Sequence, residues 1–179
     1  MRKTLVVAST ALVLGAFAGL GSPASAGDTT TTFSVTSGSL AVSAPASKAL
    51  GTGAAGTSVT AQLGDTTVTD ARAALLGSWT ATVVSSAFTA TVSGQTQTIP
   101  ATAVSYWSGL ATATTGLGVP VPGQALAINA VAIDTAKTAF SKAAGVGSNS
   151  TTWNPTVVVA VPAAAVAGDY TGTITHSVA

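Results

Sequence analysis

Residues 170–178 decide the fold class. In Tyr170-Thr171-Gly172-Thr173-Ile174-Thr175-His176-Ser177-Val178, all apolar and aromatic side chains occupy even positions, and every odd position is Thr or Ser. Successive side chains of a β-strand point to opposite faces of the sheet. The pattern therefore predicts a strand with one buried face and one face in water.

Two further stretches have strand patterns. In 78–84, Trp79, Ala81 and Val83 share one face and Thr80 and Thr82 the other. Val157 to Val161 is apolar on both faces, which is typical of a central strand.

Short β-type runs separated by turn residues fill the rest of the chain from Phe33 onward. Such spacing is typical of a β-sandwich or barrel. We therefore predict one domain over 33–179, an all-β, antiparallel β-sandwich of immunoglobulin-like type, with residues 27–32 as a flexible leader. The predicted runs are 33–43, 57–63, 66–70, 78–84, 86–93, 99–107, 126–133, 155–162 and 169–178.

The stretch from Asp134 to Ala144 is the one candidate for a helix, with Gly145 as its stop, and an extended edge is equally open there. Two stretches are predicted to be loops because of their Gly, Pro and Ser content, 116–123 and 145–150.

The N-terminus is typical of an export signal. Arg2 and Lys3 precede an apolar run from Leu5 to Leu20, and Ala24-Ser25-Ala26 has the small residues of a cleavage site. The apolar run is too short to span a bilayer, which takes about 20 residues. We expect cleavage after Ala26, a mature chain without a membrane span, and a secreted location.

Charge and cysteine content narrow the classes of partner. Once Arg2 and Lys3 are removed, the four remaining basic residues stand against five aspartates, without a basic run. Binding to nucleic acid or to an anionic membrane needs clustered Lys and Arg, so neither is expected. The chain has no cysteine, so we expect its core to hold it without disulfides.

Three stretches together resemble the WxL family of bacterial surface domains. They are 68–72 with 78–83, then Ile99-Pro100 with Tyr106-Trp107, and finally Trp153 through the C-terminal strand. The resemblance implies an all-β domain that attaches noncovalently to the Gram-positive cell wall through peptidoglycan. Of the family's two Trp-x-Leu motifs, the first falls on Trp79-Thr80-Ala81, with Ala in place of Leu. The second falls on His176-Ser177-Val178, with His in place of Trp and Val in place of Leu.

The candidate ligand-binding residues are Trp107, Trp153, Trp79 and His176, although each aromatic residue is also a candidate for the core. Trp107 and Trp153 rank first because Ser108-Gly109 and Asn154-Pro155 place them where strands meet loops. Trp79 lies within an alternating strand and should point inward. The family motif instead favours Trp79 and His176.

Two other features are predicted to be structural. Asp70 and Arg72 lie two residues apart and should form an ion pair or a turn brace. Tyr170, after Gly168-Asp169, is predicted to form a tyrosine corner in which the phenol bonds to nearby backbone.

Nothing in the sequence favours an enzyme. His176 is the only histidine, and no Gly-x-Ser-x-Gly nucleophile motif occurs. Without Cys or Glu the chain lacks the usual zinc ligand sets, and its aspartates have no calcium-loop spacing, so no metal and no cofactor are expected.

Two functions lead at this point, and a third, an unusual hydrolase, would need His176 near a surface Ser and an Asp. The first is a wall-binding module that stacks on and hydrogen-bonds to peptidoglycan or another cell-wall glycan. The second is a structural or assembly subunit that pairs with another surface protein by strand addition.

Overall fold

The computed structural model describes residues 29–179. The predicted signal over residues 1–26 and its cleavage site lie outside this range. Val35–Ala179 form one compact unit. In the described range every regular element is a strand, apart from two short 3-10 turns, η1 (Ala101–Ala103) and η2 (Ala127–Asn129), and no helix there is long enough to cross a membrane. The all-β prediction is confirmed.

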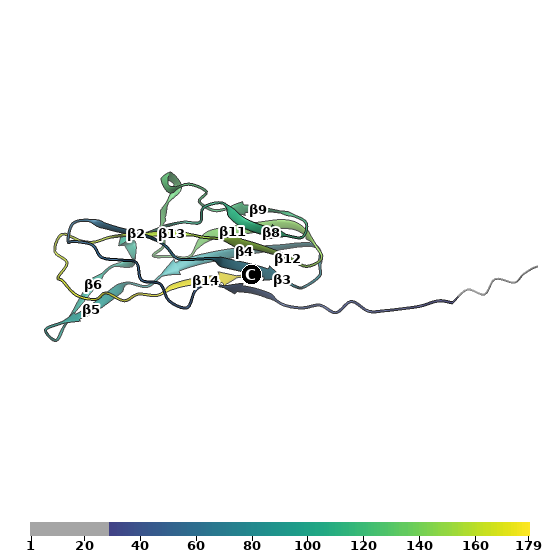
Figure 1. Cartoon of the computed structure of the whole chain (residues 1–179), viewed down its shortest axis with the longest axis horizontal. Coiled ribbons are helices and arrows are strands. Elements are labelled where there is room, and N and C mark those ends of the chain that lie inside the picture. Colours follow the sequence, from purple (N-terminus) through teal and green to yellow (C-terminus); the bar gives the residue numbers. More distant parts are fainter. Residues whose placement is uncertain (1–28) are drawn as a thin grey trace, which may run out of the picture. The chain divides into compact units, whose positions relative to one another are not determined.

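The strands form three four-stranded antiparallel sheets and one hairpin (Figure 1). Sheet A has the order β1 (Leu40–Ser43), β3 (Thr66–Asp70), β12 (Asn149–Trp153) and β8 (Ala111–Thr115). Sheet B has the order β10 (Val131–Ala132), β7 (Val104–Trp107), β13 (Thr156–Ala160) and β2 (Ser58–Gln62). Sheet C has the order β14 (Ile174–Val178), β4 (Leu75–Ser85), β11 (Lys137–Val146) and β9 (Val119–Pro122), and the hairpin pairs β5 (Phe88–Val92) with β6 (Gln95–Ile99).

The alternation seen in the sequence is confirmed on both strands that carried the prediction. On β4, Trp79, Ala81 and Val83 are buried and Thr80 is exposed. β14 pairs antiparallel with β4, and its inward positions Ile174, His176 and Val178 are half-buried, whereas Thr175 and Ser177 are exposed. Register and hydrophobic pattern agree, as they must when one face of a sheet is buried.

All three sheets contribute to one hydrophobic core. Val68 comes from sheet A, Val157 and Tyr106 from sheet B, and Val83 and Phe140 from sheet C, all buried. Val157 lies on β13, which has a paired strand on each side, as its apolar sequence predicts.

The stretch from Asp134 to Ala144 is neither helix nor edge. It contains most of β11, which lies between β4 and β9 in sheet C. The loop predicted over 116–123 contains β9, whose Pro120 and Pro122 are tolerated because β9 is the edge strand of its sheet. The loop predicted over 145–150 is only a short turn between β11 and β12.

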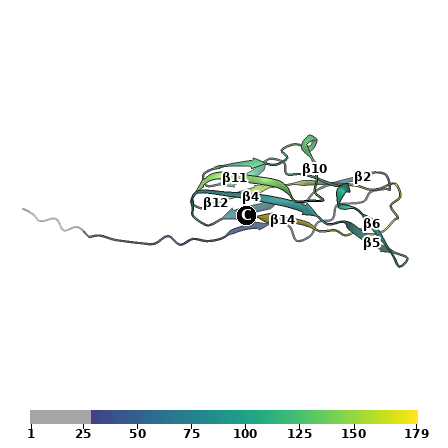
Figure 2. The same ribbon diagram turned by 180° about the vertical axis from the view of Figure 1, so that it is seen from behind.

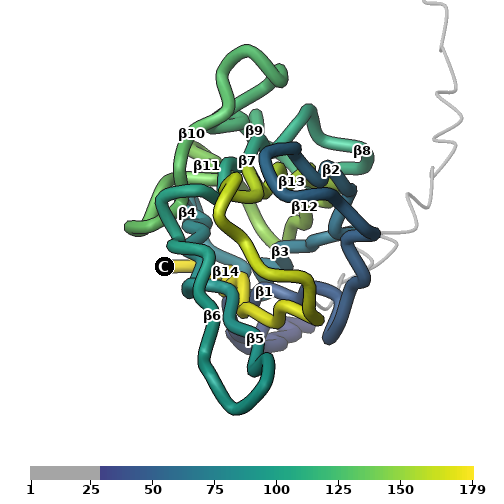
Figure 3. Tube along the Cα trace, turned by 90° about the vertical axis from the view of Figure 1, so that its left-hand side faces the viewer, coloured from purple at the N-terminus to yellow at the C-terminus, as the bar shows by residue number. Residues whose placement is uncertain are grey.

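Ser93 and Gly94 form the tight turn of the β5–β6 hairpin. Their φ angles are 49° and 75°, the left-handed region that a two-residue hairpin turn of this kind requires. The hairpin projects beyond the three larger sheets (Figure 3).

Candidate functional site

Trp107 lies on the outward face of sheet B. Along β7, Val104 and Tyr106 are buried in the core, whereas Ser105 and Trp107 alternate with them and are half-buried. The loop that carries η2 protrudes from the molecule next to β10 (Figure 2). Of the three tryptophans, Trp107 is the one whose side chain is partly open to solvent.

Strand register puts polar side chains beside Trp107. Thr156 on β13 pairs with Trp107 on one side and with Gln62 of β2 on the other. The next outward row consists of Ser105, Val158 and Thr60. Thr156 is only 7 % exposed, so the polar groups that share the outer surface with the Trp107 ring are those of Gln62, Ser105 and Thr60. We call the set Trp107, Gln62, Ser105, Val158 and Thr60 the Trp107 face.

The turn after Trp107 is held by buried hydrogen bonds. The Ser108 hydroxyl donates to the Gln124 carbonyl at 3.0 Å, and Gly109 N–H donates to the same carbonyl at 3.0 Å. Ser108 is fully buried. The strand end that carries Trp107 is therefore anchored to the start of the η2 loop.

Trp153 lies at a strand end, as predicted, but its ring faces the core. It is 0 % exposed, stacks on Phe140 with ring centroids 4.8 Å apart, and its indole Nε1–H donates to the Tyr106 hydroxyl at 3.0 Å. The expectation that Trp153 offers a ligand-binding surface beside the loop does not fit this position. Alternation along β12 turns Asn149, Thr151 and Trp153 inward together.

His176 belongs to the same aromatic cluster. Its Nε2 lies 3.4 Å from the Tyr106 hydroxyl, and its ring centroid is 6.3 Å from that of Trp153. Burial lowers the pKa of His176 to about 4, so the ring is neutral at physiological pH. Burial also raises the pKa of the Tyr106 hydroxyl. This cluster is a packed one, with limited access to its polar atoms.

Trp79 joins two sheets through a buried polar network. Its Nε1–H donates to Asn149 Oδ1 at 3.3 Å, and Asn149 Nδ2 donates to Asp70 Oδ2 at 3.4 Å. Arg72 donates to both carboxylate oxygens of Asp70, each at 2.9 Å, and also to the Ser78 carbonyl. The predicted ion pair and brace are confirmed. The hydrogen bond from Arg72 holds the pKa of Asp70 below its usual value.

Lys142 is a further buried cation near this network. It is 2 % exposed, and its Nζ donates to the Thr115 carbonyl at 3.3 Å. Burial lowers the pKa of Lys142, while the charge of Asp70 acts in the opposite direction. Gly118 covers it closely, since a Cβ there would lie 2.9 Å from Lys142 Cε.

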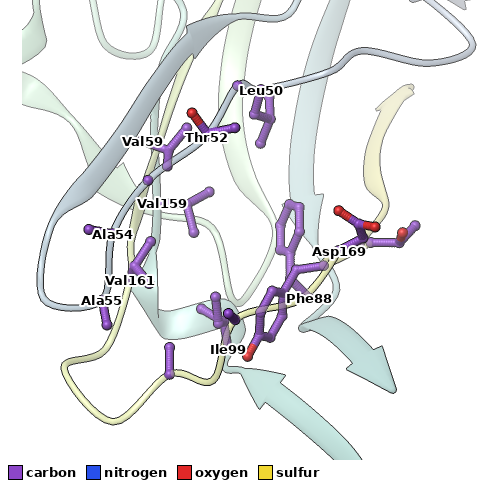
Figure 4. A pocket seen from close by; sticks show the side chains of 18 of the residues that line it. Leu50, Thr52, Ala54, Ala55, Val59, Phe88, Ile99, Val159, Val161 and Asp169 are labelled. Atoms are coloured by element: carbon purple, nitrogen blue, oxygen red, sulfur yellow. The ribbon is translucent and has the colours of Figure 1, made fainter. Parts of the chain in front are cut away.

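One cavity lies away from all four predicted site residues. Its volume is about 650 Å³, and its lining is mixed, with apolar side chains such as Val59 and Phe88 beside Lys48 and Asp169. Figure 4 shows Val59, Val159 and Phe88 around the same space. The residues beside it include Tyr170, whose hydroxyl donates to the Val166 carbonyl at 2.9 Å, as the predicted tyrosine corner requires.

The structure therefore separates the predicted site residues. Trp153 and His176 meet in one cluster, Trp79 belongs to the network with Asn149, and Trp107 stands alone on an outward face. Gln62 and Thr156 were missed, because only strand register reveals that they flank Trp107. Within residues 29–179, no three His, Cys, Asp or Glu side chains gather as a metal site.

Comparisons of the chain with protein-family models, curated proteins and solved structures find no match. The case for a function rests on the chain's own residues.

Proposed function

We propose that this chain is an exported, immunoglobulin-like β-sandwich domain that attaches noncovalently to the bacterial cell wall by stacking peptidoglycan glycan on the Trp107 face. The three antiparallel sheets around one core support the sandwich. The signal-like N-terminus supports export. The resemblance of the sequence to WxL domains supports the wall as target.

One observation carries the proposal: the partly exposed Trp107 ring lies in the same row of the strand register as the exposed Gln62, across the buried Thr156. An aromatic ring offers a flat apolar surface to the C–H face of a sugar, while hydroxyl and amide groups donate to and accept from its hydroxyls. Trp79 and Trp153 are 2 % and 0 % exposed. Their expected role is to hold the domain together.

The absence of Lys and Arg from the Trp107 face favours a neutral glycan over an anionic wall polymer. Attraction between exposed charges is screened at high ionic strength, with a Debye length of about 3 Å at 1 M salt. Stacking and neutral hydrogen bonds are not screened in this way. We therefore expect wall binding to persist at high salt.

The first test is sedimentation of the mature protein with purified sacculi. We expect Trp107→Ala to weaken binding at least about tenfold, the effect of losing roughly 1.4 kcal/mol from an aromatic anchor. Gln62→Ala should weaken it less, because one polar neighbour is lost and the ring is kept. Thermal unfolding checks that each variant stays folded.

Leu75→Ala is the matched control, since Leu75 is 80 % exposed and lies on sheet C. It should bind like wild type. Full binding by a folded Trp107→Ala variant would contradict the proposal, and so would binding abolished by about 1 M salt.

A further inference from the structure

Residues 29–37 carry two exposed apolar side chains. Phe33 is 90 % exposed and Val35 75 % exposed, and they alternate with Thr32, Ser34 and Thr36. Alternation of this kind in a Thr-rich, β-prone stretch is the pattern of a strand, yet the segment has no strand partner here. We call residues 29–37 the arm.

The arm is tethered at its C-terminal end. The Ser37 hydroxyl donates to the Arg72 carbonyl at 3.2 Å, and Gly38 N–H donates to the Ala71 carbonyl at 2.9 Å. Leu75 and Leu76, which follow Arg72 by three and four residues in the chain, are also apolar and are 80 % and 68 % exposed.

The 650 Å³ cavity has the size of a ligand site and an apolar floor. Leu50, Val59, Val159, Val161 and Phe88 contribute to the floor. Two segments without strands, 48–55 and 165–170, form its walls.

The walls contain backbone N–H groups that make no hydrogen bond within the described protein. Within the described chain, no backbone N–H of 48–55 or of 166–170 donates a hydrogen bond to protein. An extended polypeptide satisfies such groups through its own main chain while its alternate side chains enter apolar pockets. A purely apolar small molecule would leave them to water. The cavity is therefore better matched to a peptide strand than to a lipid chain.

We propose that the arm of one copy inserts into this cavity of a second copy, with Phe33 and Val35 seated on the apolar floor and the arm's backbone pairing with the walls. The root of the arm at Gly38 lies beside Ala71, at the end of β3, whereas the cavity lies toward the end that carries β2 and the β5–β6 hairpin (Figure 1). Because these ends are opposite, the acceptor is another copy.

The geometry makes the association head-to-tail. Donor and acceptor are different surfaces, so each copy has both free to engage a neighbour, and the contact generates a ring or an open chain. An extended chain rises about 3.3 Å per residue, which puts Phe33 roughly 16 Å from the root at Gly38. The arm holds no charge, and residues 27–179 carry four basic residues against five aspartates, so copies repel one another weakly.

The test is sedimentation velocity of the chain without its signal, residues 27–179, over a wide range of concentration. Wild type should form a concentration-dependent series of oligomers. The double variant Phe33→Ser with Val35→Ser should associate at least about thirtyfold more weakly, as expected on losing a buried aromatic anchor. The matched control, Thr32→Ser with Ser34→Thr, keeps the arm's composition and should associate like wild type.

The acceptor is tested separately. Leu50→Asp places a charge on the half-buried floor and should also give monomers, whereas Leu110→Asp, at a 65 % exposed position outside the cavity, should not. A synthetic peptide of residues 29–38 added to wild type should dissociate the oligomers without any change to the fold. The same peptide with Ser at both apolar positions should have no effect.

A wild type that stays monomeric at every concentration would overturn the proposal, and so would oligomers that survive the arm variant. A monomer whose Phe33 is protected from solvent would show that the arm folds back on its own domain, and would equally overturn it. The proposal is independent of glycan binding: Trp107→Ala should still associate, and the arm variant should still sediment with sacculi.

Discussion

His176 makes the free energy of unfolding depend on pH. Its ring lies against Tyr106 and Trp153, with centroids 5.9 Å and 6.3 Å away. Burial lowers its pKa from 6.5 to about 4. The unfolded chain therefore takes up a proton at this residue near pH 6.5, whereas the folded chain does so only near pH 4.

We expect the free energy of unfolding to be greatest above pH 6.5 and to fall as the pH is lowered from 6.5 to about 4. In that window the unfolded state binds more protons, and the loss reaches up to about 3 kcal/mol. Urea unfolding at a series of pH values measures it. His176→Phe should remove the slope in this window, and an unfolding free energy in wild type that does not change across it would contradict the assignment.

The pKa of Asp70, lowered chiefly by its hydrogen bond with Arg72, acts in a separate window. Its contribution is present above its usual pKa of 3.8 and is lost as the pH falls through the lowered value. In His176→Phe, the free energy of unfolding should therefore still fall as the pH is lowered below 4.

Asn149 is the residue that links Trp79 to Asp70, and we expect Asn149→Ala to destabilise the domain by about 1–3 kcal/mol. The variant leaves the buried Trp79 Nε1–H without its acceptor and removes a donor from Asp70. Asn129→Ala, at an exposed position on η2, is the control and should stay within about 0.5 kcal/mol. Equal melting temperatures for Asn149→Ala and wild type would show that the network contributes no net stability.

At the level of strands, the sequence predicts well wherever burial coincides with apolar character. β4 and β14 alternate visibly, and β13 is apolar throughout. β12 is hidden because its inward positions include Asn149 and Thr151, which are buried but polar. A hydropathy pattern therefore does not identify the inward side of β12. Trp153 at its end is then predicted to lie beside a loop.

The same cause hides β11. It turns Phe140 and Lys142 inward, and a lysine at a buried position breaks the alternation. Ala-rich composition then resembles a helix, although the register with β4 is what fixes this segment as a strand. Local propensity is overridden here by pairing on both sides, as is usual for central strands.

The sequence predicts the central residue of the candidate site, Trp107, but not the surface that surrounds it. Trp107 is identified by its place at a strand end, whereas Gln62 lies 45 positions earlier in the chain and meets it only across β13. The cavity is likewise built by segments far apart in sequence, such as those around Leu50 and Val161. Neither pairing leaves a periodic signal in any one stretch.

For the whole molecule, one core joins all three larger sheets without a disulfide. Strands of sheets A, B and C each contribute buried side chains to the same cluster, so these sheets should unfold together. The β5–β6 hairpin is attached differently. Phe88 and Ile99 at its base reach the core, and its backbone joins the rest of the fold through a bridge between Thr89 and Thr171.

We therefore expect the outer part of the β5–β6 hairpin to open well before the rest of the domain. Isolated two-stranded ribbons are marginally stable, and the far residues Thr91 and Thr96 lack core neighbours. Hydrogen–deuterium exchange followed by mass spectrometry should find peptides from 90–97 exchanging much faster than those from β4 or β11. Phe88 should slow exchange at the base, because its ring packs so closely that a Cβ at Gly172 would lie 2.7 Å from it. Equal protection of 90–97 and β4 from exchange would contradict this prediction, because the hairpin would then unfold together with the core.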